Sequence, residues 1–137
     1  MIIIDASIAN KLVLPLEEGH DKVKKIFRRH ATEEDVILTL NLIFFEVANT
    51  LATKSRIPQR IVTRSLTTIY KTQMNIYYPS EDDVKSAARL AKKFKTSVYD
   101  MLYAVVAKKH KVRLITADEK FAEATKFKFV KLLKDIA

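Results

Sequence analysis

Residues 2–7 read IIIDAS, three isoleucines that run directly into Asp5. A short β-branched run of this kind is typical of a strand that is buried on both faces of a parallel sheet. A carboxylate at the end of such a strand is costly to bury unless something compensates its charge. The stretch therefore predicts a parallel sheet, and it raises the question of what compensates Asp5.

Short apolar runs and amphipathic helical patterns alternate along the rest of the chain. Besides Ile2–Ile4, strands are expected at 35–40, 75–79 and 112–116, with a last strand or turn at 128–133. Helices are expected at 7–14, 17–30, 41–56, 58–73, 80–94, 97–110 and 118–125. Asn41, Ser80 and Ser97 precede three of these helices as candidate N-caps. The alternation predicts an α/β fold around a mainly parallel sheet of four or five strands.

Composition indicates a folded, cysteine-free protein. A chain of 137 residues with 48% hydrophobic residues is expected to form one domain, residues 1–137, with a real core. No apolar run approaches the ~18 residues of a membrane span, and Asn10 and Lys11 interrupt the first helical stretch, which argues against a signal peptide. The absence of cysteine excludes disulfides and thiolate metal sites. A cytoplasmic location is expected, without membrane association.

The net positive charge lies entirely in the last part of the chain. Residues 1–84 carry 11 basic and 11 acidic residues, whereas residues 85–137 carry 14 basic and 5 acidic residues and so hold the whole net charge of +9. The simplest interpretation is a solvated, lysine-rich surface. A second interpretation is a surface that faces a polyanion such as RNA. Lys92, Lys93, Lys108 and Lys109 are then candidate RNA contacts.

Four acidic residues fall at related places in the expected fold. Asp5 follows the first strand, Glu46 lies in the helix after the second, and Asp118 follows the strand 112–116. Asp100 begins the helix that leads into that strand. The carboxyl ends of parallel strands lie at one edge of the sheet, where ligands bind. Carboxylates gathered there would repel one another unless a hard cation such as Mg²⁺ or Mn²⁺ held them.

Each acid also has an ordinary explanation when it is taken singly. Asp5 and Asp118 could cap the helices that follow them, and Asp100 could complement a helix dipole. Glu46 could form a surface salt bridge, although its apolar neighbours favour a side chain that points inward. The shared topological position of the four favours a common site over four separate roles.

Three blocks of the sequence resemble the signature blocks of PIN-domain ribonucleases, and VapC-type toxins of toxin–antitoxin pairs are the most similar group. The resemblance extends from Ile2 to about Val130. The blocks are IIIDAS (2–7), LIFFEVANTL (42–51) and SVYDMLYAVVAKKHKVRLITADEKF (97–121). The resemblance implies a three-layer α/β/α PIN-like domain.

The resemblance also implies an activity and a set of partners. It implies a metal-dependent endoribonuclease in which Asp5, Glu46, Asp100 and Asp118 bind Mg²⁺ or Mn²⁺, with RNA as substrate, a small antitoxin as inhibitor and a homodimer as the assembly. Thr116, Ser7 and Asn49 fall near the family blocks and could orient the carboxylates, although capping, strand packing or core hydrogen bonds would also explain them. Tyr99 and Tyr103 could stack on bases or simply pack.

One feature departs from the family pattern, and four other functions compete with the one that the resemblance implies. Phe44 and Phe45 make the block around Glu46 less polar than is usual in the family, as expected of a core or of a protein-binding surface. A receiver domain needs paired acids after the first strand and a late lysine, which this chain lacks. A haloacid-dehalogenase-type phosphatase would need an acid at Ser7. A non-toxin PIN nuclease of RNA processing, or a catalytically silent PIN module, remains an alternative.

Overall fold

The computed structural model describes residues 1–54 and 56–137. Five parallel strands form one sheet in the order β3-β2-β1-β4-β5. The strands are β1 (Ile2–Ile4), β2 (Ile37–Leu40), β3 (Asn75–Tyr77), β4 (Arg113–Thr116) and β5 (Val130–Leu132). The helices are α1 (Ala6–Val13), α2 (His20–Ala31), α3 (Leu42–Thr53), α4 (Gln59–Lys71), α5 (Glu81–Phe94), α6 (Val98–His110) and α7 (Glu119–Thr125), followed by a 3₁₀ turn at Leu133–Asp135.

The central strand β1 is buried on both faces, as its three isoleucines predict. Ile2 and Ile4 belong to one hydrophobic core, and Ile3 belongs to the other. This division follows from the two-residue period of a strand, which points successive side chains to opposite faces. The sheet therefore separates two cores.

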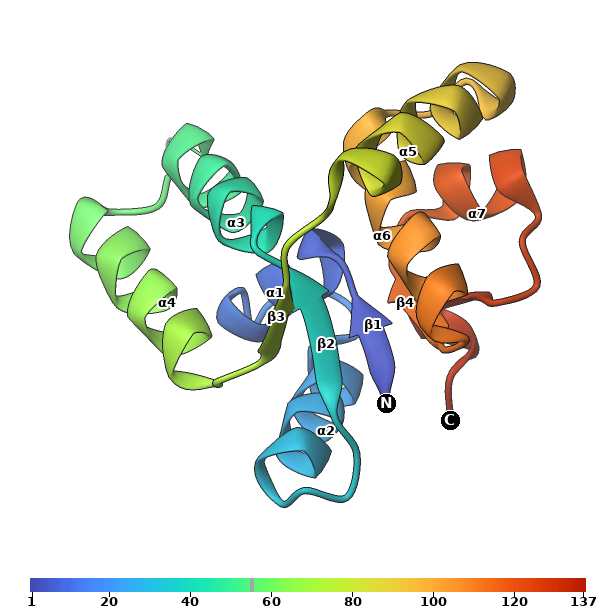
Figure 1. Ribbon diagram of the computed structural model, residues 1–137. Coiled ribbons are helices and arrows are strands. Elements are labelled where there is room, and N and C mark those ends of the chain that lie inside the picture. The colour runs from blue at the N-terminus through green and yellow to red at the C-terminus, as the bar shows by residue number, and fades with distance from the viewer. Residues whose placement is uncertain (55) are drawn as a thin grey trace.

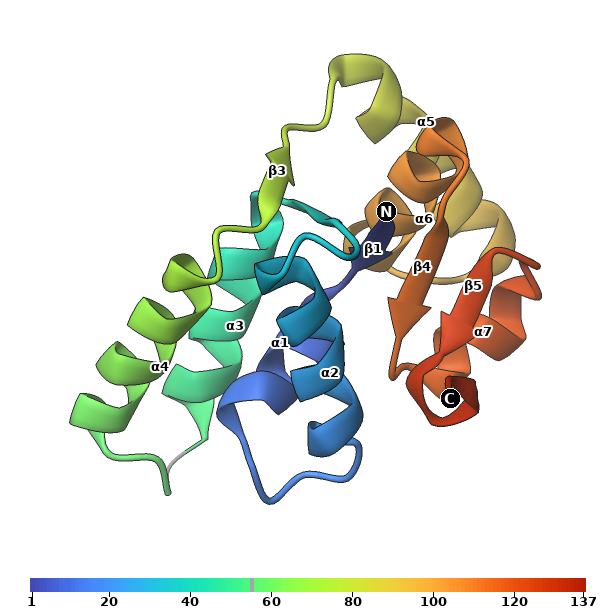
Figure 2. The ribbon, with the colours of Figure 1, turned by 90° about the horizontal axis from the view of Figure 1, so that it is seen from below.

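Helices cover the two faces of the sheet in two groups. Buried side chains of α1, α2, α3 and α4 belong to the same core as Ile4, whereas those of α5, α6 and α7 belong to the same core as Ile3. Figures 1 and 2 show the two groups of helices on either side of the strands. Parallel strands joined by right-handed crossovers give this arrangement, because the chain adds strands first on one side of β1 and then on the other. The predicted three-layer α/β/α architecture is confirmed.

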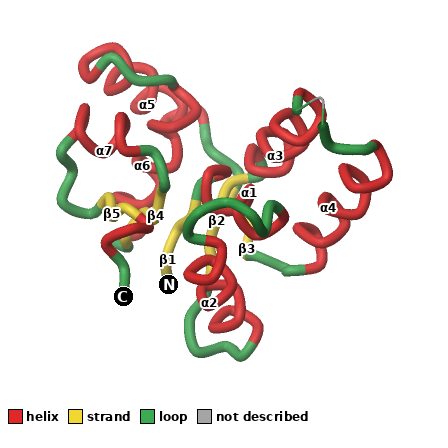
Figure 3. The backbone as a smooth tube through the Cα atoms, turned by 180° about the vertical axis from the view of Figure 1, so that it is seen from behind, coloured by secondary structure: helices red, strands yellow, loops and turns green. Residues whose placement is uncertain are grey.

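The order in which the chain adds strands reverses at β1, and this creates a topological switch point between β1 and β4. β1 pairs with β2 on one side and with β4 on the other, with Ile4 beside Ile115. Seen from behind, the strands separate α5–α7 from α3 and α4 (Figure 3). In an open parallel sheet the crevice at such a point, outside the carboxyl ends of the strands, is where ligands bind.

Lysines end the three helices on the Ile3 face. Lys95, Lys111 and Lys126 follow α5, α6 and α7 with φ values of 58°, 57° and 53°, in the left-handed region that usually favours glycine. A cation at this position complements the negative end of the helix dipole. These lysines terminate helices in a chain with a single glycine.

The element boundaries differ from prediction where turn chemistry intervenes. The helix expected at 17–30 begins only at His20, because Gly19 adopts φ +88° and cannot continue a helix. The helix expected at 41–56 ends at Thr53, and Ser55 lies outside the described residues. Ser80 and Ser97 cap their helices as predicted, whereas Asn41 makes no side-chain capping bond. None of the helices in residues 1–54 and 56–137 is long and apolar enough to cross a membrane.

Candidate metal centre at the carboxyl edge of the sheet

Asp5 lies at the switch point and is held there by its neighbours. Its side chain is 7% exposed, and it caps α1 by accepting from the backbone N–H of Ser7 at 3.0 Å. The hydroxyl of Ser7 donates to Oδ1, and the hydroxyl of Thr116 donates to Oδ2. Both carboxylate oxygens therefore accept a hydroxyl hydrogen bond, one from α1 and one from the end of β4.

The loop after β4 orients these two hydroxyls. The N–H of Ala117 donates to Ser7 Oγ at 2.9 Å, and the N–H of Asp118 donates to Thr116 Oγ1 at 3.1 Å. Each hydroxyl accepts from the loop backbone and donates to Asp5, so the orientation of its hydrogen is fixed by its two partners. This network joins β1 to β4 across 111 residues of sequence and sets the position of the Asp5 carboxylate.

Asp5 forms no ion pair with the basic groups of residues 1–54 and 56–137. Burial raises the pKa of the Asp5 carboxyl to about 6, although the bonds from Ser7 and Thr116 lower it and the charge of Asp100 raises it further. This raised pKa is unusual for a capping aspartate, because the hydrogen bonds of a cap lower the pKa of its carboxyl, whereas here burial outweighs them. Asp5 therefore caps a helix, and its burial disfavours the charged form of its carboxyl.

Glu46, on α3, is the second acid at the carboxyl edge of the sheet. We call Asp5, Glu46, Asp100 and Asp118 together the acidic edge. Tyr103 of α6 donates its hydroxyl to Glu46 Oε1 at 2.7 Å, and Tyr103 itself is 1% exposed. Burial raises the pKa of Glu46, the Tyr103 bond lowers it, and the charges of Asp5 and Asp100 raise it. The hydrogen bond fixes Glu46 from the opposite side of the sheet and excludes Tyr103 from stacking on bases.

The hydrogen bond from Tyr103 to Glu46 is a role that the sequence did not predict, since only base stacking or packing was expected of Tyr103. Tyr103 lies three positions after Asp100 on α6, and residues with this spacing share one face of a helix. Asp100 and Tyr103 therefore both point toward the carboxyl edge. That spacing is the signal that links Tyr103 to the site, whereas its partner Glu46 is 57 residues away in sequence.

Asp100 and Asp118 complete the acidic edge. Burial raises the pKa of Asp100, the Ser97 hydroxyl lowers it, and the charge of Asp118 raises it. Asp118 Oδ1 accepts from the N–H of Phe121 at 3.0 Å, so Asp118 also caps α7. The ordinary capping roles of Asp5 and Asp118 are real, and they position the carboxylates at the edge.

The four carboxylates influence one another electrostatically without a cation between them. Asp100 acts on the pKa of both Asp5 and Glu46 and is acted on by Asp118. None of the four forms an ion pair with a basic group of residues 1–54 or 56–137. In the same described residues, no group of three or more His, Cys, Asp or Glu side chains is placed so that it could hold a metal ion. The four acids therefore influence one another electrostatically, but their side chains are not gathered into a ligand set in this structure.

The donor set suits a hard divalent cation. Carboxylate oxygens select Mg²⁺ or Mn²⁺ over softer metals. Burial and mutual repulsion leave the negative charge of Asp5, Glu46 and Asp100 uncompensated by the protein, and a divalent ion would supply that compensation. The donor chemistry of these residues therefore suits a metal ion of this class, whereas their side chains are not gathered around one point in the described residues.

A pocket of about 520 Å³ opens beside two of the acids. Its wall includes Asp100 and Asp118 together with Lys95 and Lys120. With Glu123, the pocket brings three carboxylates and two cations into one opening, a combination suited to a metal ion and an anionic group side by side. We refer to it below as the edge pocket; its other lining residues are Thr96, Phe121 and Ala124.

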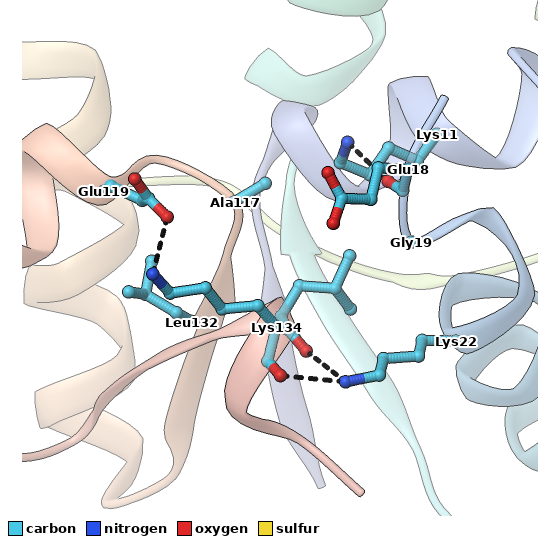
Figure 4. Close-up of a pocket in the computed structure, with 9 residues that line it drawn as sticks. Lys11, Glu18, Gly19, Lys22, Ala117, Glu119, Leu132 and Lys134 are labelled. Carbon is cyan, nitrogen blue, oxygen red and sulfur yellow. Dashed lines mark hydrogen bonds and ion pairs between the residues drawn. The ribbon is translucent and has the colours of Figure 1, made fainter. Parts of the chain in front are cut away.

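A second pocket, of about 290 Å³, lies next to the same β4–α7 loop but is closed by its own contacts (Figure 4). Lys11 donates to the carbonyl of Glu18 at 2.8 Å, and Lys22 donates to that of Lys134 at 2.9 Å. Lys134 pairs with Glu119 at 2.8 Å. Each lysine drawn in Figure 4 has a partner within the chain. The bond from Lys22 to Lys134 and the pair of Lys134 with Glu119 attach the C-terminal segment to α2 and α7.

The three candidate orienting residues have different surroundings. Ser7 and Thr116 both contact Asp5 directly. Asn49 lies exposed one turn beyond Glu46, and its carbonyl accepts from the Thr53 hydroxyl at 2.8 Å. An orienting role for Asn49 stays a prediction.

Comparison with known proteins gives the same fold. The VapC20 toxin of Mycobacterium tuberculosis, described as cleaving the sarcin–ricin loop, shares 19% identity over 90% of this chain and 95% of its own, with a TM-score of 0.71. A toxin–antitoxin complex from Klebsiella pneumoniae shares 18% identity over 99% of this chain and 100% of its own, with a TM-score of 0.68.

A third solved structure is VapBC2 from Rickettsia felis bound to a DNA fragment from its promoter. It shares 12% identity over 96% of this chain and 97% of its own, with a TM-score of 0.63. No curated protein matches the chain. The PIN domain family model matches residues 2–126, a range that contains all four acids of the edge. The chain therefore belongs to the PIN domain family.

Proposed function

We propose that this chain is a single-domain, metal-dependent endoribonuclease of the VapC type. The observation that carries the proposal is the acidic edge, where Asp5 is buried at the switch point near three other acids and pairs with no basic group among the described residues. The family assignment removes the receiver and phosphatase alternatives. The PIN-family alternatives, a nuclease of RNA processing or a silent module, differ from this proposal in target or in activity.

Asp5, Glu46, Asp100 and Asp118 would hold the Mg²⁺ or Mn²⁺. A bound ion of this kind supplies a nucleophilic hydroxide and offsets charge that develops on the phosphate and the leaving oxygen. The chain's own contribution is to position the carboxylates. Ser7 and Thr116 fix both oxygens of Asp5, and Tyr103 fixes Glu46. These contacts orient the ligands before metal or substrate arrives.

The edge pocket supplies a place for the substrate phosphate. Lys95 and Lys120 line it together with Asp100 and Asp118. Without these lysines an acidic edge would repel a polyanion, whereas cations at its border attract the phosphate backbone. An RNA substrate would also place the protein in the cytoplasm.

Protein partners are part of the proposal. Two of the structural relatives are described as toxin–antitoxin complexes, which supports a cognate antitoxin. Phe45 and Tyr70 are 67% and 58% exposed, and Phe44 stacks on Tyr70 with ring centroids 4.1 Å apart. Exposed aromatic side chains of this kind are characteristic of protein interfaces. They support a partner on α3 and α4, either the antitoxin or a second copy in a homodimer.

Cleavage of RNA by the purified chain tests the proposal. We expect divalent-dependent internal cuts with Mg²⁺ or Mn²⁺, and we expect a chelator to stop them and added metal to restore them. Sequencing the product ends would identify the cut positions and so distinguish a toxin with one target from a processing nuclease. Absence of cleavage of tRNA, ribosomal RNA and messenger RNA with both metals would contradict the proposal.

A further inference from the structure

The excess positive charge of the chain lies on one side of the sheet. Residues 85–137, which hold the whole net charge of +9, form most of α5 and all of α6, β4, α7 and β5. Helices α5, α6 and α7 together cover the Ile3 face (Figure 1). The charge asymmetry of the sequence is therefore an asymmetry of the folded molecule.

Two further pockets continue from the edge pocket over this side. A groove of about 500 Å³ runs between α5 and α6, and Phe94 in its wall is the residue before Lys95 of the edge pocket. A third pocket, of about 520 Å³, shares Lys108 and Phe129 with that groove and adds Lys111 and Arg113. The groove and the third pocket share two lining residues, and the groove approaches the edge pocket where Phe94 and Lys95 follow one another in the chain. We call them together the basic track.

Nearly all the cations of the basic track are free of carboxylate partners. Lys109 is the exception, because its ammonium lies 3.3 Å from Asp83 Oδ1 and donates to the Tyr77 hydroxyl at 2.7 Å. The other cations are exposed and form no ion pair with the described residues; they are Arg89, Lys93, Lys95, Lys108, Lys111, Arg113 and Lys120. Of the four lysines singled out from the sequence, Lys93 and Lys108 line the track without an ion pair, whereas Lys92 is exposed but lines none of the three pockets.

Aromatic rings lie among these cations. Phe94 and Phe127 meet edge to face with centroids 5.1 Å apart, and Phe127 stacks on Phe129 at 5.3 Å. The ammonium of Lys93 lies 5.4 Å from the centre of the Phe94 ring. Half-buried rings beside unpaired cations are the usual platform for single-stranded nucleic acid, since bases stack on the rings while phosphates meet the cations.

We propose that the basic track binds the RNA strand that flanks the scissile phosphate, an inference that rests on the proposed function. The strand leaves the acidic edge past Lys95, its phosphates meet Lys93 and Lys108 along the groove, and a base lies against Phe94 or Phe127. An acidic protein segment would meet the same cations, but it would make no use of the rings or of the continuity with the edge pocket. RNA is therefore the occupant that all three observations favour.

The test compares two variants that lose equal charge on opposite faces of the sheet. The track variant is Lys93→Gln/Lys108→Gln/Lys111→Gln, and the control is Lys24→Gln/Lys25→Gln/Arg28→Gln on α2. All six positions are exposed. Both carry Asp5→Asn so that bound RNA stays intact, and binding is measured on labelled single strands of roughly 4 and roughly 16 nucleotides. Thermal melting verifies that each variant is folded.

We expect the track variant to bind the longer RNA at least about tenfold more weakly than the control at 0.1 M salt. Each lost phosphate contact on a single strand removes about 0.7 from the slope of log K against log salt, so three lost contacts lower it by about 2. The triple Lys→Arg variant should restore both values. The shorter RNA should show a smaller difference, because it reaches less of the track.

Equal affinities and equal salt slopes for the track variant and the control would overturn the proposal. So would a track variant that binds RNA normally but has lost an acidic protein partner. Wild-type RNA cleavage, measured in parallel, distinguishes the two claims. Cleavage without track-dependent binding refutes the track alone, whereas track-dependent binding without cleavage refutes the nuclease and leaves the track as an RNA-binding surface.

Discussion

Replacing Asp5 by Asn lowers kcat/KM for RNA cleavage by more than about 100-fold. Loss of a residue that only orients a metal ligand costs at most about 100-fold, so a larger loss indicates a direct ligand. Asp5 lies at the switch point and is coupled to Glu46 and Asp100. Asn keeps the size of the side chain and can still accept a hydrogen bond from Ser7 or Thr116, but it removes the negative charge that holds a divalent cation. We expect Asp100→Asn to have the same effect for the same reason.

Asp21→Asn is the matched control for both substitutions. Asp21 is exposed on α2 and belongs to no ion pair among the described residues, so its loss removes one negative charge far from the acidic edge. Steady-state cleavage of one RNA by the four proteins measures the effect. If Asp5→Asn cleaves as fast as Asp21→Asn, Asp5 has no catalytic role.

Without metal, the same Asp5→Asn substitution stabilises the fold at neutral pH. Burial raises the pKa of Asp5 from 3.8 to about 6 in the folded protein. Below pH 3.8 the carboxyl is protonated in both the folded and unfolded states, and the folded protein has its full stability. As the pH rises through about 6, the folded state must accept a buried charge and loses stability, on the order of 3 kcal/mol in total. Asn removes this loss.

Denaturant unfolding in a chelating buffer, at a series of pH values from 4 to 7, measures this difference. The free energy of unfolding of the wild type should fall relative to that of the variant across the window from pH 4 to pH 6. Asp83, whose pKa is lowered to about 2, acts in the opposite direction but at lower pH, and it is common to both proteins. Parallel stability curves would contradict an uncompensated Asp5.

The amino-acid sequence predicts the framework of the site because the framework depends on local patterns. The run at Ile2–Ile4 implies a doubly buried strand, and the structure has one at the centre of the sheet. Acids that follow strands reach the carboxyl edge in any parallel sheet. Asp5 and Asp118 could be read equally as caps, and the structure shows that each does cap a helix. Local patterns cannot separate the two roles.

Other parts of the site depend on contacts between distant segments. The bond from Tyr103 to Glu46 joins α6 to α3 across the sheet, and it requires the strand order, which no local pattern encodes. The pairing of Lys109 with Asp83 is likewise tertiary, and it removes Lys109 from the cations that RNA could meet. The helix expected from residue 17 begins only at His20, because Gly19 adopts a left-handed conformation, and a Cβ at this position would lie 2.7 Å from the side chain of Leu133.

Calorimetric titration of Mn²⁺ into the metal-free protein tests the claim that the four acids of the edge share a divalent cation. We expect saturable binding at pH 7 by the wild type and by Asp21→Asn, and none by Asp5→Asn or Asp100→Asn. Near pH 6 the heat should also depend on the buffer, because metal binding displaces a proton from Asp5. A wild type that binds no Mn²⁺, or an Asp5→Asn variant with an unchanged isotherm, would contradict the claim.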